Sequence, residues 1–226
     1  MPDELQTYYA ARASEYDEVY AKPERRIDLR AMQGWLPPIL AGRRVLEIAC
    51  GTGYWTRFLA PVAQSIVAID AVQQTLQIAR ARVPDERVTF AVADAYRLPG
   101  TLGKFTGAFA GFWLSHVPRA RQREFFGQLH ERLQPGSRVV LLDNLYCDDS
   151  STPIAEQDED GNTYQLRKLK DGSVHRVLKN FLLEPELRSL IRDVANVGHV
   201  GHVGDQVQFA SWRYYWGLSY LTAGGA

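Results

Sequence analysis

Acidic and polar side chains recur at the ends of short apolar runs in the first two thirds of this chain. The runs are rich in Val, Ile, Leu and Ala and have the length of buried strands. In an open sheet of parallel strands, the carboxyl ends of the strands share one edge, and ligands bind at that edge. One such acid alone would be an ordinary loop residue, but several in register predict a ligand site. These polar residues are Glu47, Asp70, Asp94, Ser115-His116 and Asp143-Asn144.

A glycine turn follows the first of these runs. Gly51 and Gly53 lack a Cβ, so the backbone there can approach a ligand closely. The helix expected next presents free N–H groups and the positive end of its dipole, which favour an anionic group. Asp70 lies at about the spacing at which an acid accepts hydrogen bonds from ribose hydroxyls. The pattern indicates a ligand with a ribose and a negatively charged group, although a tight turn also uses glycine for backbone geometry alone.

The elements that must position these residues alternate between strand and helix. The expected strands cover residues 44–49, 65–70, 88–93, 105–112 and 138–142, and the expected helices between them include 71–82 and 121–133. Such alternation favours parallel pairing with helices on the faces of the sheet. Asp171-Gly172 lies between two strand-like runs and predicts a β-hairpin. Residues 203–220 predict one or two final strands, so the expected fold class is α/β with a parallel sheet that ends in an antiparallel pair.

The length of 226 residues favours a single domain over residues 1–226. Its N-terminal part, residues 1–40, is expected to be helical and to break at Pro37-Pro38. The core is expected over 41–145, a hairpin insertion over 150–183, and a C-terminal helix with strands over 184–226.

Charge, hydropathy and cysteine content exclude several classes of protein. The 26 Lys and Arg residues balance 26 Asp and Glu residues, so the chain has no basic footprint for nucleic acid. No apolar run approaches the roughly 20 residues needed to cross a bilayer, and the acidic start of the sequence is not that of a signal peptide. Cys50 and Cys147 are the only cysteines, so we expect free thiols and a cytoplasmic location.

The glycine turn does not complete the dinucleotide fingerprint G-x-G-x-x-G. Counted from Gly51 and Gly53, the third glycine would fall at Thr56, whose branched side chain obstructs close packing of helix and strand. A nicotinamide-dependent oxidoreductase is therefore kept only as an alternative.

Residues 45–53, Val-Leu-Glu-Ile-Ala-Cys-Gly-Thr-Gly, resemble motif I of the class I S-adenosylmethionine-dependent methyltransferases, usually written hh(D/E)hGxGxG. Ala49 replaces the first glycine of that motif. Four later segments are similar to further motifs of the family in the same order, and the resemblance covers about residues 41–144. The four segments are 69–70, 93–99, 112–118 and 133–136.

The resemblance implies a Rossmann-like, doubly wound α/β fold: a mostly parallel seven-stranded sheet with helices on both faces and an antiparallel last strand. It implies S-adenosyl-L-methionine as cofactor and S-adenosyl-L-homocysteine as product. In the family pattern, Asp70 binds the ribose and Asp94 binds the adenine amine. The other core residues assigned to the cofactor by resemblance are Glu47, Ala49, Gly51, Gly53, Ala71, Ala95, Tyr96 and Phe112.

The tyrosine-rich start of the chain is similar to the opening helix of small-molecule members such as the type 11 and type 12 groups. In those proteins this segment folds over the cofactor as a lid. Tyr8 and Tyr16 are then expected to contact the sulfonium end of the cofactor or its carboxylate. The alternative is an amphipathic helix that uses its tyrosines for packing.

His116 is the candidate catalytic base, because it follows the fourth strand and histidine titrates near neutrality. Methyl transfer from a sulfonium is an in-line displacement that mainly requires alignment and exclusion of water. A base is needed only where the acceptor holds a proton at neutral pH, and His116 could instead be a loop residue that shapes the pocket. We expect no metal site, since His199 and His202 lack a Cys or an acid at a familiar ligand spacing.

The predicted function is transfer of a methyl group from S-adenosylmethionine to an oxygen, nitrogen or carbon of a small-molecule acceptor. Residues 150–183 are expected to build the acceptor side. Residues 111–114 do not match the motif of amino-methylating nucleic-acid enzymes, so neither nucleic acid nor a membrane is an expected partner, and the expected assembly is a monomer or homodimer. A protein that binds the cofactor without catalysis remains the alternative, because cofactor motifs and chemistry are separable.

Overall fold

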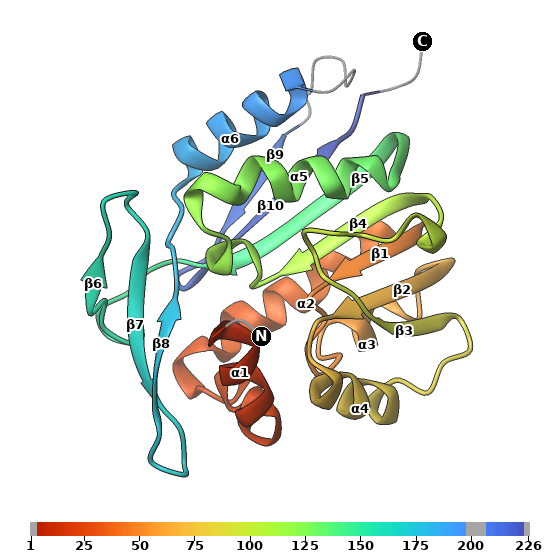
Figure 1. Cartoon of the computed structure of the whole chain (residues 1–226). Helices are drawn as coiled ribbons and strands as arrows, with labels where there is room; N and C mark the ends of the chain where they lie inside the picture. Colours follow the sequence, from red (N-terminus) through yellow and green to blue (C-terminus); the bar gives the residue numbers. More distant parts are fainter. Residues whose placement is uncertain (1–3, 198–206, 224–226) are drawn as a thin grey trace.

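Seven strands form one mixed sheet in the order β3-β2-β1-β4-β5-β10-β9 (Figure 1). The structure is a computed structural model that describes residues 4–197 and 207–223. The strands of this sheet are β1 (Arg44–Ile48), β2 (Ser65–Asp70), β3 (Val88–Val92), β4 (Phe105–Gly111), β5 (Leu133–Asn144), β9 (Gln208–Ser211) and β10 (Tyr215–Leu221).

Strands β1 to β5 pair in parallel, and the last strand runs against them. Ile48 lies opposite Ile69 on β2 and Ala110 on β4, so these three strands end at the same edge. Strand β10 pairs antiparallel with β5, with Tyr215 opposite Asn144, and also antiparallel with β9. This arrangement confirms the expected Rossmann-like doubly wound sheet and its antiparallel last strand.

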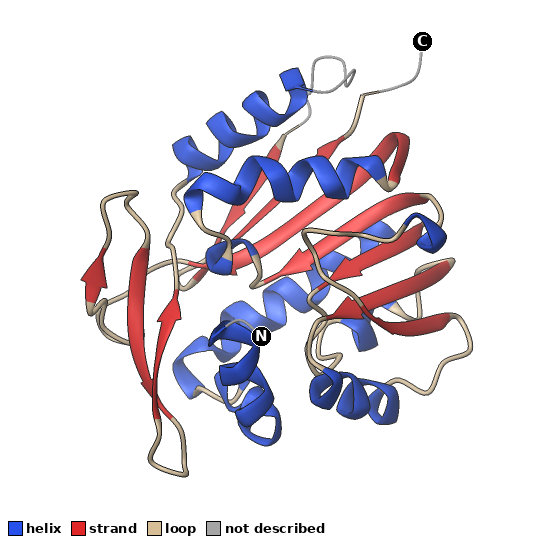
Figure 2. Cartoon of the chain, in the orientation of Figure 1, coloured by secondary structure: helices blue, strands red, loops and turns tan. Residues whose placement is uncertain are grey.

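Helices cover both faces of the sheet (Figure 2). Leu36 of α2, Leu59 of α3 and Leu76 of α4 pack into one apolar core, while Phe125 of α5 and Leu187 of α6 pack into the core on the other face. Strands covered on both faces require nearly continuous apolar sequence, which β4 and residues 139–142 of β5 have. The helices are α1 (Glu4–Ala11), α2 (Arg26–Leu40), α3 (Thr56–Leu59), α4 (Gln73–Arg82), α5 (Gln122–Glu131) and α6 (Glu184–Val197).

The expected break at Pro37-Pro38 is wrong, because α2 continues through both prolines to Leu40. Both lie in the last turn of the helix, where each proline lacks the N–H that would donate to the carbonyl four residues earlier. Leu29, Met32 and Leu36 are fully or almost fully buried on one stripe of this helix, so tertiary packing outweighs the local cost of the prolines.

A second, three-stranded sheet stands at the edge toward which the parallel strands point (Figure 1). Its strands are β6 (Glu156–Gln157), β7 (Thr163–Lys168) and β8 (Val174–Leu178), in the order β6-β7-β8. Strands β7 and β8 pair antiparallel around Asp171-Gly172, as the hairpin prediction required. Tyr8 of α1 is buried with Leu169 and Val177 of this sheet, so the start of the chain and the hairpin meet over that edge.

Candidate functional site

A cavity of about 270 Å³ opens at the carboxyl edge of the parallel strands. Its walls come from the segments that follow β1 to β4, from the start of the chain, and from the 3₁₀ turn η4 (Leu114–His116). Nine residues assigned from the sequence line it together: Tyr16, Ala49, Asp70, Ala71, Asp94, Ala95, Tyr96, Phe112 and His116. Tyr9 and Arg121 also line it and were not anticipated, whereas Trp113, which lines it too, belongs to the segment 112–118 that resembles the family.

The Asp70 carboxylate is held in one orientation at the end of β2. Its Oδ2 accepts a hydrogen bond from the Gly51 amide at 2.8 Å, and its Oδ1 accepts from the Val72 amide at 2.8 Å and the Thr75 hydroxyl at 3.2 Å. Burial raises the pKa of Asp70, while these hydrogen bonds oppose the rise. The oxygens keep further lone-pair directions, so this carboxylate can still accept from a ligand hydroxyl.

The glycine turn is covered by the start of the chain. Gly51 has φ +55°, and a Cβ there would lie 2.7 Å from the Tyr16 ring. The Thr52 hydroxyl donates to Asp17 at 2.6 Å, and Arg82 pairs with the same carboxylate and donates to the Thr52 oxygens. The 3₁₀ segment η1 (Ala13–Tyr20) is thereby attached to the turn.

Two residues on the cavity wall adopt a backbone conformation that usually needs glycine. Ala49 has φ +51° and Phe112 has φ +59°, a left-handed region that costs an L-residue about 1–2 kcal/mol. Ala49 stands where the family motif has its first glycine, and the backbone still makes the turn that this glycine would make. Strain of this kind concentrates at ligand sites.

Asp94, Tyr96, Trp113 and Arg121 line the cavity together. The Arg121 guanidinium lies 3.6 Å from the centre of the Tyr96 ring, and the Asp94 carboxylate accepts from the Tyr96 amide at 2.8 Å. The buried indole N–H of Trp113 has no hydrogen-bond partner among the described residues. Buried donors are nearly always satisfied, so a ligand acceptor at this wall would supply what the protein leaves open.

His116 is fixed through both ring nitrogens. Its Nδ1 lies 2.6 Å from the Leu178 carbonyl, which can only accept, so Nδ1 carries the proton. Its Nε2 then accepts from the Tyr9 hydroxyl at 2.9 Å. Burial lowers the pKa of His116 well below its ordinary value, and the nearby charges of Lys179 and Arg167 lower it further. The imidazole is therefore neutral near pH 7.

Four residues assigned from the sequence lie outside the cavity wall. Gly51 and Gly53 shape the turn, and Tyr8 is buried against the small sheet. Glu47 is 1% exposed beneath the turn, and its Oε2 has no partner in the described part of the chain. Burial raises the pKa of Glu47 to about 8, against the effect of the Thr56 hydroxyl.

A buried ion pair lies behind His116. Lys179, which is 3% exposed, donates to Asp143 Oδ1 at 3.0 Å and to the Ser115 hydroxyl at 2.6 Å. Burial lowers the pKa of Lys179 to about 8, although Asp143 favours the charged form. Sequence reasoning missed Lys179 because no motif marks it in the second half of the chain.

Within residues 4–197 and 207–223, no three His, Cys, Asp or Glu side chains come together as a ligand set. His199 and His202 lie outside the described residues. Within the described part of the chain, no helix is long and apolar enough to cross a membrane.

Residues 45–136 match the methyltransferase domain family. The matched segment runs from β1 through β4 to the start of β5, and the likeness is to a methyltransferase domain. A demethylmenaquinone methyltransferase from Clavibacter sepedonicus is 34% identical to the chain over 116 residues, which are 51% of this chain and 44% of that protein. The O-methyltransferase cnsE from Penicillium expansum is 34% identical over 107 residues, 45% of this chain and 38% of that protein. The chain thus spans less than half the length of these curated relatives.

The likeness to one solved structure extends beyond the methyltransferase domain to almost the whole chain. The DhpI-SAM-HEP complex has a TM-score of 0.76 and 25% identity, and the match covers 96% of this chain and 95% of that chain. The small sheet and the N-terminal segment therefore lie within the part of the fold that the two chains share.

Proposed function

We propose that this chain is an S-adenosylmethionine-dependent methyltransferase that acts on a small molecule. The observation that carries the proposal is the cavity at the carboxyl edge of β1 to β4, which Asp70, Asp94 and His116 line together. The names of the curated relatives, which are methyltransferases, support the same activity.

The residues of the cavity fit this cofactor. Asp70 offers free lone pairs to ribose hydroxyls, and Asp94 with Tyr96 offers a polar and an aromatic surface to adenine. The unpartnered Trp113 N–H is a further donor on that wall. When bound, S-adenosylmethionine supplies a methyl group on a positively charged sulfur, which is already activated for displacement.

The residues of the chain then have to orient the acceptor and exclude water. The N-terminal segment closes over the glycine turn through Tyr16 and Asp17. We propose that His116 takes up a proton at Nε2, through the Tyr9 hydroxyl, where the acceptor has one to lose. Because burial lowers its pKa, His116 is a weak base, and acceptors without such a proton suit the site best.

The finer assignments belong to the same proposal. Residues 150–183 form the acceptor side, because the small sheet stands over the edge where the cavity opens. The balanced charge of 26 against 26 favours a small acceptor over nucleic acid. We also propose that the protein is located in the cytoplasm and that it is a monomer or a homodimer.

Calorimetry with S-adenosylmethionine and S-adenosylhomocysteine tests the cofactor, with NADH as the comparison ligand. Incubation with methyl-labelled donor and a metabolite extract tests turnover. Binding of the adenosyl compounds together with label transfer supports the proposal. Binding without transfer to any extract component would favour the non-catalytic alternative, and binding of NADH alone would overturn the cofactor assignment.

A further inference from the structure

A second cavity, of about 420 Å³, lies between the N-terminal segment, the end of β5 and the small sheet. It shares no lining residue with the first cavity, yet the two are neighbours: Tyr8 lines one and Tyr9 the other, and Lys179 lies close behind His116. Six Lys and Arg side chains and two carboxylates line it. The six cations are Arg12, Lys22, Arg25, Arg167, Lys168 and Lys179.

Arg25 is the most unusual of these cations. It is 4% exposed, and no ion pair links it to a carboxylate within the described residues. Its Nε donates to the Ser150 hydroxyl at 2.8 Å, and its guanidinium lies 5.1 and 5.4 Å from the centres of the Tyr214 and Tyr215 rings. A buried charge without a counter-ion is costly, so an anionic ligand would supply what this site lacks.

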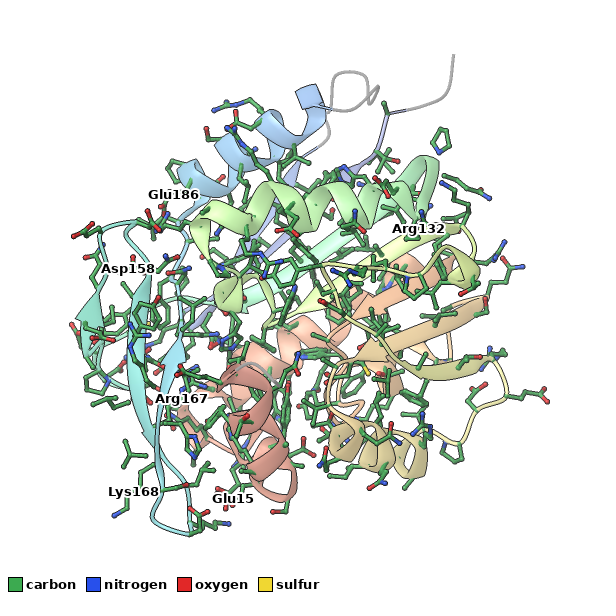
Figure 3. The ribbon with its side chains drawn as sticks, in the orientation of Figure 1. Glu15, Arg132, Asp158, Arg167, Lys168 and Glu186 are labelled. Atoms are coloured by element: carbon green, nitrogen blue, oxygen red, sulfur yellow. The ribbon has the colours of Figure 1, made fainter. Side chains whose placement is uncertain are left out.

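Further donors converge on the same space. Lys22 donates to the Ser150 carbonyl at 2.5 Å, and burial together with the charge of Arg25 lowers its pKa. The Asn144 side-chain amide is buried and has no partner in the described part of the chain. Figure 3 shows Arg167 between the small sheet and α1, where its guanidinium lies 5.9 Å from the centre of the Tyr8 ring.

The carboxylates near the cavity do not cancel this charge. Asp143 forms an ion pair with Lys179. Glu18 lines the cavity but forms an ion pair with Lys170. Glu24 accepts from the Ser150 hydroxyl at 2.7 Å but is exposed to solvent. Glu15 is the remaining lining carboxylate. The wall therefore combines net positive charge with hydrogen-bond donors, which suits a ligand group that only accepts.

We infer that the second cavity binds the methyl acceptor through an anionic group, so the acceptor is a small organic acid with a carboxylate, phosphate or phosphonate. This inference rests on the proposed function. The acidic side chains of the first cavity, Asp70 and Asp94, repel such a group, whereas the basic wall beyond Tyr9 and His116 attracts it. An oxyanion also needs no base, which agrees with the weak basicity of His116.

Calorimetric titrations with acetate, methylphosphonate and inorganic phosphate test the inference, each with and without saturating S-adenosylhomocysteine, with acetamide as the neutral analogue of acetate. We expect binding of at least one anion, no detectable binding of acetamide, and weaker binding as salt is added. Comparison of the three anions shows which headgroup the cavity prefers.

Three substitutions locate the site: Arg25→Gln, Lys22→Gln and Arg167→Gln. Each removes a charged donor, so we expect about ten- to hundredfold weaker anion binding, with the affinity for S-adenosylhomocysteine changed less than about threefold. Arg123→Gln is the matched control, because Arg123 is an exposed arginine of α5 that pairs with Asp193 away from the cavity. Lys22 and Arg167 are less buried than Arg25, so they keep the test valid if Arg25→Gln does not fold.

The outcomes separate this inference from the proposed function. Anion binding that is equal in the wild type and all three variants, or absent while S-adenosylhomocysteine binds, overturns the inference alone. A parallel loss of affinity for S-adenosylhomocysteine also overturns it, because the cavity would then hold the cofactor's own carboxylate. If S-adenosylhomocysteine does not bind the wild type at all, the proposed function fails first.

Discussion

The Tyr9 hydroxyl donates to His116 Nε2 at 2.9 Å, across 107 positions of sequence. This bond joins the first helix to the turn after β4, and the two rings pack edge to face with centroids 5.6 Å apart. Both residues line the first cavity, and Tyr8, the neighbour of Tyr9, lines the second. Burial and two neighbouring cations keep the imidazole neutral.

A neutral His116 predicts a flat pH profile. Its pKa lies well below the ordinary 6.5, so the ring does not change charge between about pH 6 and 8. We expect kcat, measured at saturating substrates, to vary little over that range. An acidic limb near pH 6.5 that disappears in His116→Gln would show that the ring titrates normally and acts as a base.

Lys179 predicts a loss of acceptor affinity at alkaline pH. It faces Asp143, Ser115, Arg167 and Arg25, and its pKa is lowered to about 8. Above that pH Lys179 becomes neutral and the basic cavity loses one positive charge, so KM for an anionic acceptor should rise. The donor affinity should stay constant. Lys179→Arg keeps its charge at that pH, so a rise in KM that persists in this variant assigns the effect to another group.

Asp70→Ala should weaken binding of S-adenosylmethionine by about ten- to hundredfold. The change removes an ionised acceptor for ribose, and hydrogen bonds to charged groups contribute about 1.5–3 kcal/mol. It also frees the Gly51 and Val72 amides that Asp70 now holds. Calorimetry measures the effect, with Asp85→Ala as control because Asp85 pairs with the nearby, exposed Arg87 and does not line the cavity. If the two variants bind S-adenosylmethionine equally well, Asp70 does not bind the ribose.

Gly51→Ala should destabilise the fold more than Gly42→Ala. Both glycines have positive φ, but a Cβ on Gly51 meets the Tyr16 ring at 2.7 Å whereas nothing lies within 4 Å of one on Gly42. The backbone cost of about 1–2 kcal/mol is shared, so the difference in unfolding free energy reports the collision. Urea denaturation measures it, and adding Tyr16→Ala should remove most of the difference. If both alanines cost the same, Tyr16 does not sit on the turn in solution.

Glu47→Gln should stabilise the ligand-free protein above neutral pH. Burial raises the pKa of Glu47 from 4.5 to about 8, so between these values the folded chain holds a proton that the unfolded chain has released. The wild type therefore loses stability as pH rises through that interval, while the glutamine variant does not titrate. The gap between their Tm values should widen from about pH 5 to 8. A constant gap would contradict the raised pKa.

The sequence alone indicated the alternation of strands and helices, a parallel sheet and several residues of the site. Apolar runs that alternate with helices can only bury their surface in a parallel α/β sheet, and acids at the ends of those runs must meet at one edge. Asp70, Asp94 and the glycine turn were therefore placed by local pattern.

The tertiary structure decided which side chains from distant segments meet. Tyr8 and Tyr9 are adjacent in one helix, but consecutive helical residues point about 100° apart, so Tyr8 turns to the small sheet and Tyr9 to His116. Arg25, Ser150 and Lys179 converge on the second cavity from three segments with no shared motif. Local periodicity sets which face a residue occupies, but only packing of the N-terminal segment and the small sheet against the main sheet decides what that face contacts.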